Sequence, residues 1–260
     1  MVKQTHNKQS INGLDQPKTR EKNGNLRILL LYVVTLGIYL IAGYSQFKMF
    51  RVNQHRRNME ELSTLRLLGT FRRYFFTGWN LVLQIAFLLI AVTDELTKFF
   101  KFTNTQKRIE RARKFFFSTL VFPSSLLVAS VFWTIWHVDR ELIFPKIIDT
   151  FYPSWLNHTL HTFILLPLLI ETVIHFKSAY SNLSRTRALL ILLIYVTVYQ
   201  TLYLSVYFQH GVWLYPIYKV LTWNQRIIFT LSQLFLAISY QQIGISLMKR
   251  DSGLPKTKLK

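Results

Sequence analysis

The sequence predicts an all-α protein, a polytopic bundle of about six transmembrane helices with both termini in the cytoplasm. Half of its 260 residues are hydrophobic and 15% are aromatic, yet the net charge is +20. Apolar runs near the roughly 20 residues that a helix needs to cross a bilayer recur along most of the chain. Lysine and arginine are concentrated between these runs, a pattern typical of apolar spans joined by basic loops rather than of one soluble domain.

Six apolar segments make up the predicted membrane domain, residues 28–248, and each is close to the length of one span. The fourth is the least regular, because it is short and contains Pro167, Glu171 and His175. Such polar interruptions are tolerated in a span where neighbouring helices cover them. The six predicted spans are residues 28–44, 75–93, 115–136, 159–176, 188–208 and 227–248.

Both ends of the chain are predicted to be basic cytoplasmic tails. Residues 1–27 are polar, rich in Asn and Gln and without apolar periodicity, which predicts disorder. The span that follows is expected to be a signal anchor, since its apolar run is longer than that of a cleaved signal peptide. Residues 249–260 end in Lys256-Thr-Lys258-Leu-Lys260. This ending resembles a dilysine retrieval signal read by cytoplasmic coat proteins, with an ordinary basic tail as the alternative, so an endoplasmic reticulum membrane is expected.

The distribution of basic residues predicts the orientation. With the N-terminus inside, the inner segments carry 21 Lys and Arg residues and the outer segments carry 11. Cytoplasmic loops of membrane proteins show this excess. Residues 48–73 are the exception, because they place seven basic residues on the predicted outer side. Either this stretch is an interfacial amphipathic segment or the first span is misjudged.

Composition and motifs disfavour several classes of function. The chain has no cysteine, which excludes disulfides, a thiol nucleophile and a cysteine metal cluster. Nucleic-acid binding is not expected, since the basic residues lie between apolar runs and not along one polar surface. No His-Glu-x-x-His motif or carboxylate cluster accompanies the histidines, so neither a metal nor another cofactor is expected. No internal repeat indicates a transporter.

The candidate site lies at the outer edge of the membrane domain. Thr77 falls in the first turn of the second predicted span, and His158 and His161 fall at the start of the fourth, so helix rise places all three at similar depth. A hydroxyl becomes a nucleophile when a nearby base takes its proton, and histidine suits that task at neutral pH. Two simpler readings stay open. Thr77 could bond back to its own helix, and the histidines could be interfacial capping groups.

Other ionisable residues are predicted to have structural roles. Asp94, Glu171 and His175 lie near the inner ends of their spans, and Glu171 and His175 are about 15 Å along the helix from His161 at 1.5 Å per residue. That separation favours packing or a relay over catalysis. Asp139 and its neighbours Arg140 and Glu141 lie just outside the third span, where opposite charges can pair and orient a loop.

Several motifs together resemble the androgen-induced membrane protein family over about residues 75–250. The central part is Val131-Phe132-Trp133, Asp139-Arg140-Glu141, Pro145-Lys146 and the stretch from Asp149 to Thr162, which contains Asn157-His158-Thr-Leu-His161-Thr162. Thr93-Asp94 and Gly211-x-Trp213-x-Tyr215-Pro216 also fit. The N-terminal tail and residues 48–73 make a longer start than is usual in the family.

The resemblance implies an intramembrane threonine hydrolase that cleaves fatty acid esters of hydroxy fatty acids. By position, Thr77 corresponds to the threonine nucleophile and His161 to the histidine base. Asn157, His158 or Asp139 would orient His161 or stabilise the developing oxyanion, and the sequence does not choose among them. The expected partners are a lipid ester substrate and the bilayer. The alternative from another class is a non-catalytic lipid-binding or scaffold protein that uses the same polar cluster to recognise a head group.

Overall fold

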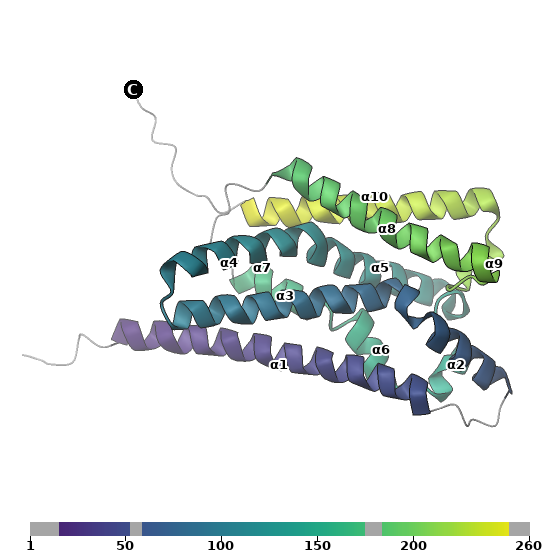
Figure 1. Ribbon diagram of the computed structural model, residues 1–260, viewed down its shortest axis with the longest axis horizontal. Helices are drawn as coiled ribbons and strands as arrows, with labels where there is room; N and C mark the ends of the chain where they lie inside the picture. Colours follow the sequence, from purple (N-terminus) through teal and green to yellow (C-terminus); the bar gives the residue numbers. More distant parts are fainter. Residues whose placement is uncertain (1–15, 53–58, 175–183, 250–260) are drawn as a thin grey trace, which may run out of the picture.

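The computed structural model describes residues 16–52, 59–174 and 184–249, and the regular secondary structure of these residues is helical (Figure 1). The long helices lie lengthwise in one bundle, with α1 packed along α3 and α10 along α5. Short helical turns join several of them. The elements are α1 (Gln16–Val52), α2 (Met59–Phe71), η2 (Arg72–Tyr74), α3 (Phe76–Phe99), α4 (Thr103–Phe116), η3 (Phe117–Val121), α5 (Phe122–Asp139), η4 (Arg140–Leu142), η5 (Lys146–Thr150), α6 (Ser154–His161), α7 (Leu165–Ile174), α8 (Arg185–His210), α9 (Ile217–Val220) and α10 (Trp223–Lys249).

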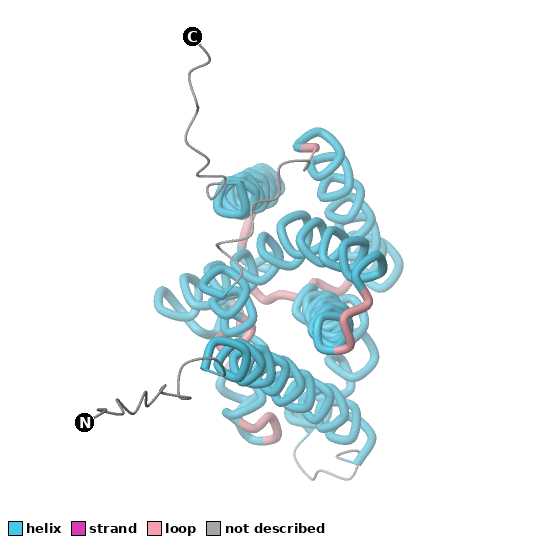
Figure 2. Tube along the Cα trace, turned by 90° about the vertical axis from the view of Figure 1, so that its left-hand side faces the viewer, coloured by secondary structure: helices cyan, strands magenta, loops and turns pink. Residues whose placement is uncertain are grey.

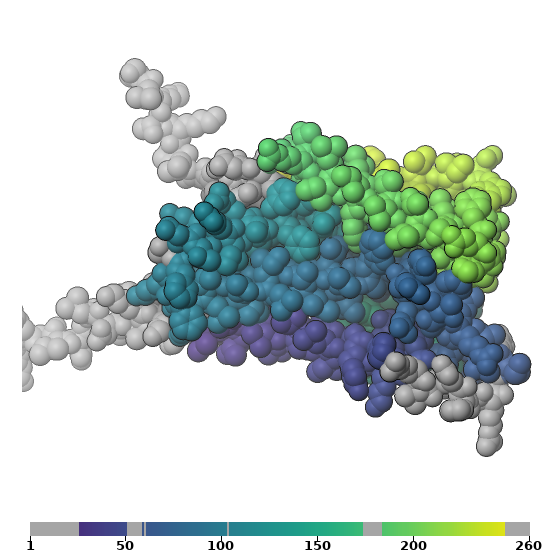
Figure 3. All heavy atoms as spheres, viewed as in Figure 1, coloured from purple at the N-terminus to yellow at the C-terminus, as the bar shows by residue number. Residues whose placement is uncertain are grey.

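The described residues contain five helices that are long and apolar enough to cross a membrane, and a sixth span if the bent pair α6 and α7 crosses as one. The prediction of a multi-pass helical membrane bundle is therefore confirmed. Large apolar side chains are exposed along α8 and α10, among them Ile194 and Phe235, as expected for lipid-facing surfaces. These two helices form one continuous flank of the molecule (Figure 3).

Helix α1 begins and helix α10 finishes at the same end of the bundle (Figures 1 and 2). We call this the terminal end. The opposite end, where α3 and α10 begin and α8 finishes, is called the site end. An even number of crossings places the two ends of a chain on one side of a membrane. The lysines Lys256, Lys258 and Lys260 lie outside the described residues.

The first predicted span and the basic segment after it differ from the structure in their limits. Helix α1 starts at Gln16, inside the predicted N-terminal tail, and continues to Val52, well beyond residue 44. Helix α2 then occupies much of the predicted basic segment 48–73. The first span is therefore longer than predicted, and the interfacial position of the basic segment stays a prediction.

The fourth predicted span is broken, because a kink of 41° separates α6 from α7. Proline at position 167 has no backbone N–H, and its ring excludes the Phe163 carbonyl from the usual helical hydrogen bond. The Phe163 carbonyl instead accepts hydrogen bonds from the Leu166 backbone N–H and from the Tyr39 hydroxyl, both at 2.9 Å. The next carbonyl, that of Ile164, accepts one from Gln84 Nε2, also at 2.9 Å. Side chains of α1 and α3 thus satisfy the backbone where the span breaks.

A second proline produces the same arrangement at the start of α5. Pro123 follows η3, a short π-helical segment in which the regular helical hydrogen bonding changes. The carbonyl of Thr119, four residues before this proline, accepts a hydrogen bond from Gln241 Nε2 at 3.0 Å. The same amide group donates to the Ala188 carbonyl at 2.8 Å. One side chain of α10 therefore joins the third membrane span to α8.

A buried ion cluster joins four elements near the terminal end. Arg113 of α4, which is 1% exposed, contacts Asp94 at 2.8 Å, Glu95 at 3.0 Å and Glu171 at 2.6 Å. Its guanidinium also donates to the Tyr32 hydroxyl, which in turn donates to Glu171. Asp94 and Glu171, for which the sequence predicted packing or a relay, thus lie in one ion cluster, and Arg113 falls outside the predicted spans. His175 lies outside the described residues.

Candidate active site

Thr77 and His161 meet at the site end of the bundle. Thr77 is in the first turn of α3, and His161 is the last residue of α6. The Thr77 hydroxyl oxygen lies 3.3 Å from His161 Nε2, although 84 residues separate them in the sequence. Hydrogen bonds of catalytic pairs are often long before substrate binds. The hydroxyl and the imidazole are therefore placed for proton transfer between them.

The tautomer of His161 follows from the group at its other ring nitrogen. Nδ1 lies 3.0 Å from the backbone carbonyl of Asn157, one turn earlier in α6. A carbonyl oxygen can only accept a hydrogen bond, so Nδ1 carries the proton. Nε2 of the neutral ring is then the acceptor that faces Thr77. This is the protonation state that a general base requires.

Aromatic side chains of α5 hold the His161 ring in place. The Phe132 ring stacks on the imidazole with 3.6 Å between centroids and 15° between planes. Trp133 Nε1 donates to the His161 backbone carbonyl at 3.3 Å. His161 is 8% exposed, which leaves it one accessible edge on the cavity described below. A ring with this support loses little conformational freedom when a substrate binds.

The start of α3 is fixed by contacts outside the helix. The backbone N–H of Phe76 donates to the Tyr215 hydroxyl at 3.0 Å, and Trp79 Nε1 donates to the Arg73 carbonyl at 2.9 Å. Burial raises the pKa of Tyr215, so this phenol stays neutral. Thr77 lies at the positive end of the α3 dipole, where negative charge is stabilised.

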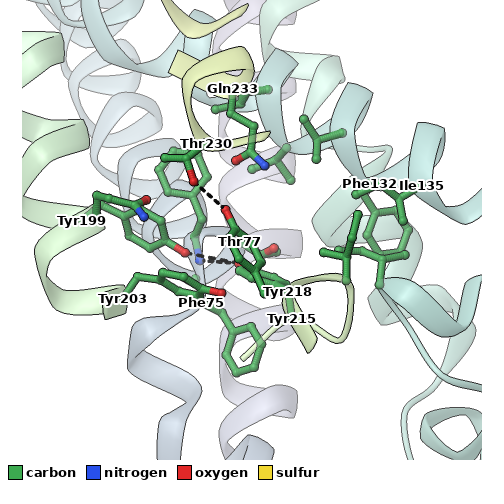
Figure 4. Close-up of a pocket in the computed structure, with 18 of the residues that line it drawn as sticks. Phe75, Thr77, Phe132, Ile135, Tyr199, Tyr203, Tyr215, Tyr218, Thr230 and Gln233 are labelled. Atoms are coloured by element: carbon green, nitrogen blue, oxygen red, sulfur yellow. Dashed lines mark hydrogen bonds between the residues drawn. The ribbon is translucent and has the colours of Figure 1, made fainter. Parts of the chain in front are cut away.

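Thr77 and His161 both line a cavity of about 400 Å³. This volume is within the range of small-molecule sites in proteins. Helices α5, α8 and α10 supply an apolar wall that includes Leu127, Val196 and Leu234. Figure 4 shows tyrosine side chains gathered close to Thr77, with Phe132 and Ile135 on the opposite side. The tyrosines are Tyr199, Tyr203, Tyr215 and Tyr218.

The profile of the FAR-17a/AIG1-like protein family matches residues 29–247, which cover nearly all of the membrane domain and include both Thr77 and His161. The chain belongs to this family. Androgen-dependent TFPI-regulating protein of Mesocricetus auratus is 38% identical over 176 residues, 66% of this chain and 74% of the relative. The human protein of that name is 32% identical over 203 residues, covering 78% and 86%. Human androgen-induced gene 1 protein is 33% identical over 162 residues, covering 60% and 67%. No solved structure matches significantly.

In this member of the FAR-17a/AIG1-like family, the three further site residues expected from the sequence do not surround the His161 ring. Of these three residues, Asn157 alone contacts the ring, and it does so through its backbone carbonyl. The exposed His158 ring stacks on Trp133 with 5.5 Å between centroids, and its Nδ1 lies 3.3 Å from Thr162 Oγ1. Asp139 is exposed and accepts a hydrogen bond from the Glu141 backbone N–H at 2.9 Å.

Two contributors were not assigned to the site from the sequence. Phe132 stacks on His161, and Tyr215 holds the start of α3. Both appear in the sequence analysis only as parts of family motifs. Their place in these motifs was the available signal. Over residues 16–52, 59–174 and 184–249, no group of three or more His, Asp or Glu side chains is arranged to bind a metal ion.

Proposed function

We propose that this family member is an intramembrane hydrolase of lipid carboxylic esters, with Thr77 as nucleophile and His161 as base. The observation that carries the proposal is the 3.3 Å contact between Thr77 Oγ1 and His161 Nε2 in the wall of an apolar cavity. The family resemblance of the central motif makes fatty acid esters of hydroxy fatty acids the expected substrate class.

In the first step Thr77 Oγ1 attacks the ester carbonyl carbon and passes its proton to His161 Nε2. The positive end of the α3 dipole lies beside the oxyanion that forms and stabilises it. The C–O bond to the alcohol then breaks, and His161 returns the proton to the leaving alkoxide. The products of this step are a hydroxy fatty acid and an acyl ester of Thr77.

In the second step water replaces the alcohol. His161 Nε2 takes a proton from the water molecule, which attacks the acyl carbonyl, and the Thr77 alkoxide leaves and recovers the proton. The fatty acid and the free enzyme result. During both steps the Asn157 carbonyl accepts the hydrogen bond of Nδ1 and thereby stabilises the positive imidazolium.

The cavity suits an ester whose polar group lies between apolar chains. Hydroxyl and imidazole groups meet the ester at one point, and the walls from α5, α8 and α10 are apolar. A wall of this kind discriminates chains by length and shape, because each methylene group contributes only about 0.8 kcal/mol when buried. Chain-length selectivity is therefore expected to be gradual.

The first experiment compares purified wild type, T77A and H161A in hydrolysis of a branched fatty acid ester and in labelling by a fluorophosphonate probe. Both substitutions should lower the rate by about 10³-fold or more, as in other hydroxyl-based acyl transfers. T93A is the matched control, since Thr93 is an exposed threonine of the same helix that bonds to the Leu89 carbonyl at 2.8 Å. An inert wild type, or full activity in T77A, would favour the non-catalytic lipid-binding protein.

We further infer that the protein resides in the endoplasmic reticulum membrane with both termini cytoplasmic. The basic-residue asymmetry and the lysines Lys256 and Lys258 support this inference. Substituting both lysines by serine should move a tagged protein forward to the Golgi and abolish its coprecipitation with coat proteins. A glycosylation acceptor added to either end should remain unmodified. Glycosylation at either end would contradict the orientation.

A further inference from the structure

Among the described residues that line the cavity, the one permanently charged side chain is Arg72. It comes from the short turn η2, immediately before α3. The polar residues that line the cavity from α8 and α10 are neutral, such as Gln200 and Gln233. The cavity therefore has a cationic side at η2, and the rest of its surface is uncharged.

Arg72 has no acidic partner within residues 16–52, 59–174 and 184–249. It forms no ion pair with any residue that the structure describes, and its guanidinium carbon lies 5.1 Å from the centre of the Phe47 ring. An arginine over an aromatic ring keeps its N–H donors free at the edge of the guanidinium plane. This geometry matches the two oxygens of a carboxylate.

The backbone holds Arg72 close to Thr77. A Cβ atom placed on Gly78 would lie 3.6 Å from the Arg72 carbonyl oxygen, so the turn η2 folds against the first turn of α3. The hydrogen bond from Trp79 Nε1 to the Arg73 carbonyl fixes the same turn. Arg72 is exposed, which places it at the opening of the cavity, with Thr77 deeper in the wall.

We propose that Arg72 binds the free carboxylate of the substrate while the ester lies at Thr77, so that the enzyme selects lipid esters that carry a negative charge. This inference rests on the proposed function. A neutral ester of the same chain length fills the apolar walls equally well but lacks the charge-assisted hydrogen bonds. Arg72 is thus a specificity residue and takes no part in bond breaking.

The test uses one branched ester of a hydroxy fatty acid, supplied as the free acid and as its uncharged primary amide, in vesicles of phosphatidylcholine. R72Q should lower the ratio of kcat/KM for the acid to that for the amide by about tenfold or more, mainly through KM. R72K should give a ratio between those of wild type and R72Q, because lysine carries a point charge without the planar guanidinium. R73Q is the matched control, because the neighbouring arginine lies over Tyr74 and does not line the cavity.

Three results would overturn the inference: an equal loss for acid and amide in R72Q, the same change of ratio in R73Q, or an effect that appears only in vesicles containing an anionic phospholipid. The last would mean that Arg72 binds lipid phosphate. If wild type hydrolyses neither substrate, the proposed function fails. Binding of stearate and stearamide to the same proteins then tests the carboxylate site on its own. Wild type should prefer stearate and R72Q should not; a wild type without preference refutes the carboxylate site.

Discussion

The packing of α10 against α5 depends at one point on the absence of a side chain. A Cβ atom at Gly244 would lie 2.8 Å from Cδ1 and 3.1 Å from Cγ of Phe122. Cγ is close to the Phe122 backbone, so the ring cannot avoid this clash by moving its far end. Phe122 is itself buried in the main core cluster. The residue at position 244 must therefore be very small.

G244A is expected to lower the free energy of unfolding by about 1–3 kcal/mol, because it overpacks a close helix contact. Thermal unfolding in detergent, followed by size-exclusion chromatography, measures the change. G37A is the control, since a Cβ at Gly37 meets nothing within 4 Å. That substitution should be neutral or stabilising through the helix propensity of alanine. Equal melting temperatures for the two variants would refute the argument.

At the residue scale, the sequence could predict that Thr77 and His161 lie together, since His161 belongs to a family motif and Thr77 falls at a similar depth in the bundle. It could not predict the groups around them. Asn157 contributes a backbone carbonyl, which no side-chain pattern reveals. The stack of Phe132 on His161 depends on how α5 and α6 pack, and that packing is decided by the whole bundle.

Among the elements, the two proline breaks are the features that a hydropathy pattern conceals. Residues 159–176 are apolar enough to be predicted as one span, yet Pro167 divides them into α6 and α7. The division ends α6 at His161, and the loop after it carries the carbonyls that Tyr39 and Gln84 satisfy. The span could be predicted from composition, whereas the break needed partners on α1 and α3.

Substitution of Tyr39 tests the coupling between a break and its partner. Y39F removes one of the two donors to the Phe163 carbonyl, which keeps the Leu166 N–H, and the expected loss of stability is about 0.5–1.5 kcal/mol. In a P167A background residue 167 regains an N–H, so the loss from Y39F should be smaller. A double-mutant cycle on melting temperatures reads this difference. Strictly additive effects of the two substitutions would show that the hydroxyl and the proline act independently.

The molecule as a whole is held at its terminal end by Arg113, which joins side chains of α1, α3, α4 and α7. The sequence could not predict this cluster, because a charged residue beside an apolar run is normally a loop residue. Its burial is possible only where carboxylates distant in the chain arrive at the same point. The overall bundle, in contrast, could be predicted from the apolar runs alone.

R113Q leaves buried Glu171 without a cation, while Lys98 still pairs with Asp94 at 2.9 Å and Glu95 at 2.7 Å, so it should destabilise the fold by about 3–5 kcal/mol. Most of the variant is expected to aggregate on detergent extraction. R111Q is the matched control, since Arg111 is an exposed residue of the same helix that bonds to the Lys107 carbonyl. Extraction yield and monodispersity measure both variants. Normal recovery of R113Q would show that the cluster contributes little.

The hydrogen bonds of Gln241 set an order of completion during biosynthesis. Its amide, on a helix synthesised after α5 and α8, supplies a donor for the Thr119 and Ala188 carbonyls of two earlier elements. An unsatisfied carbonyl in hydrocarbon costs several kcal/mol. A chain that has not yet formed α10 therefore lacks the donor that replaces the missing N–H of Pro123 at the Thr119 carbonyl. The break before α5 is thus completed only when α10 packs against it, so assembly of the third membrane span depends on a helix that is synthesised later.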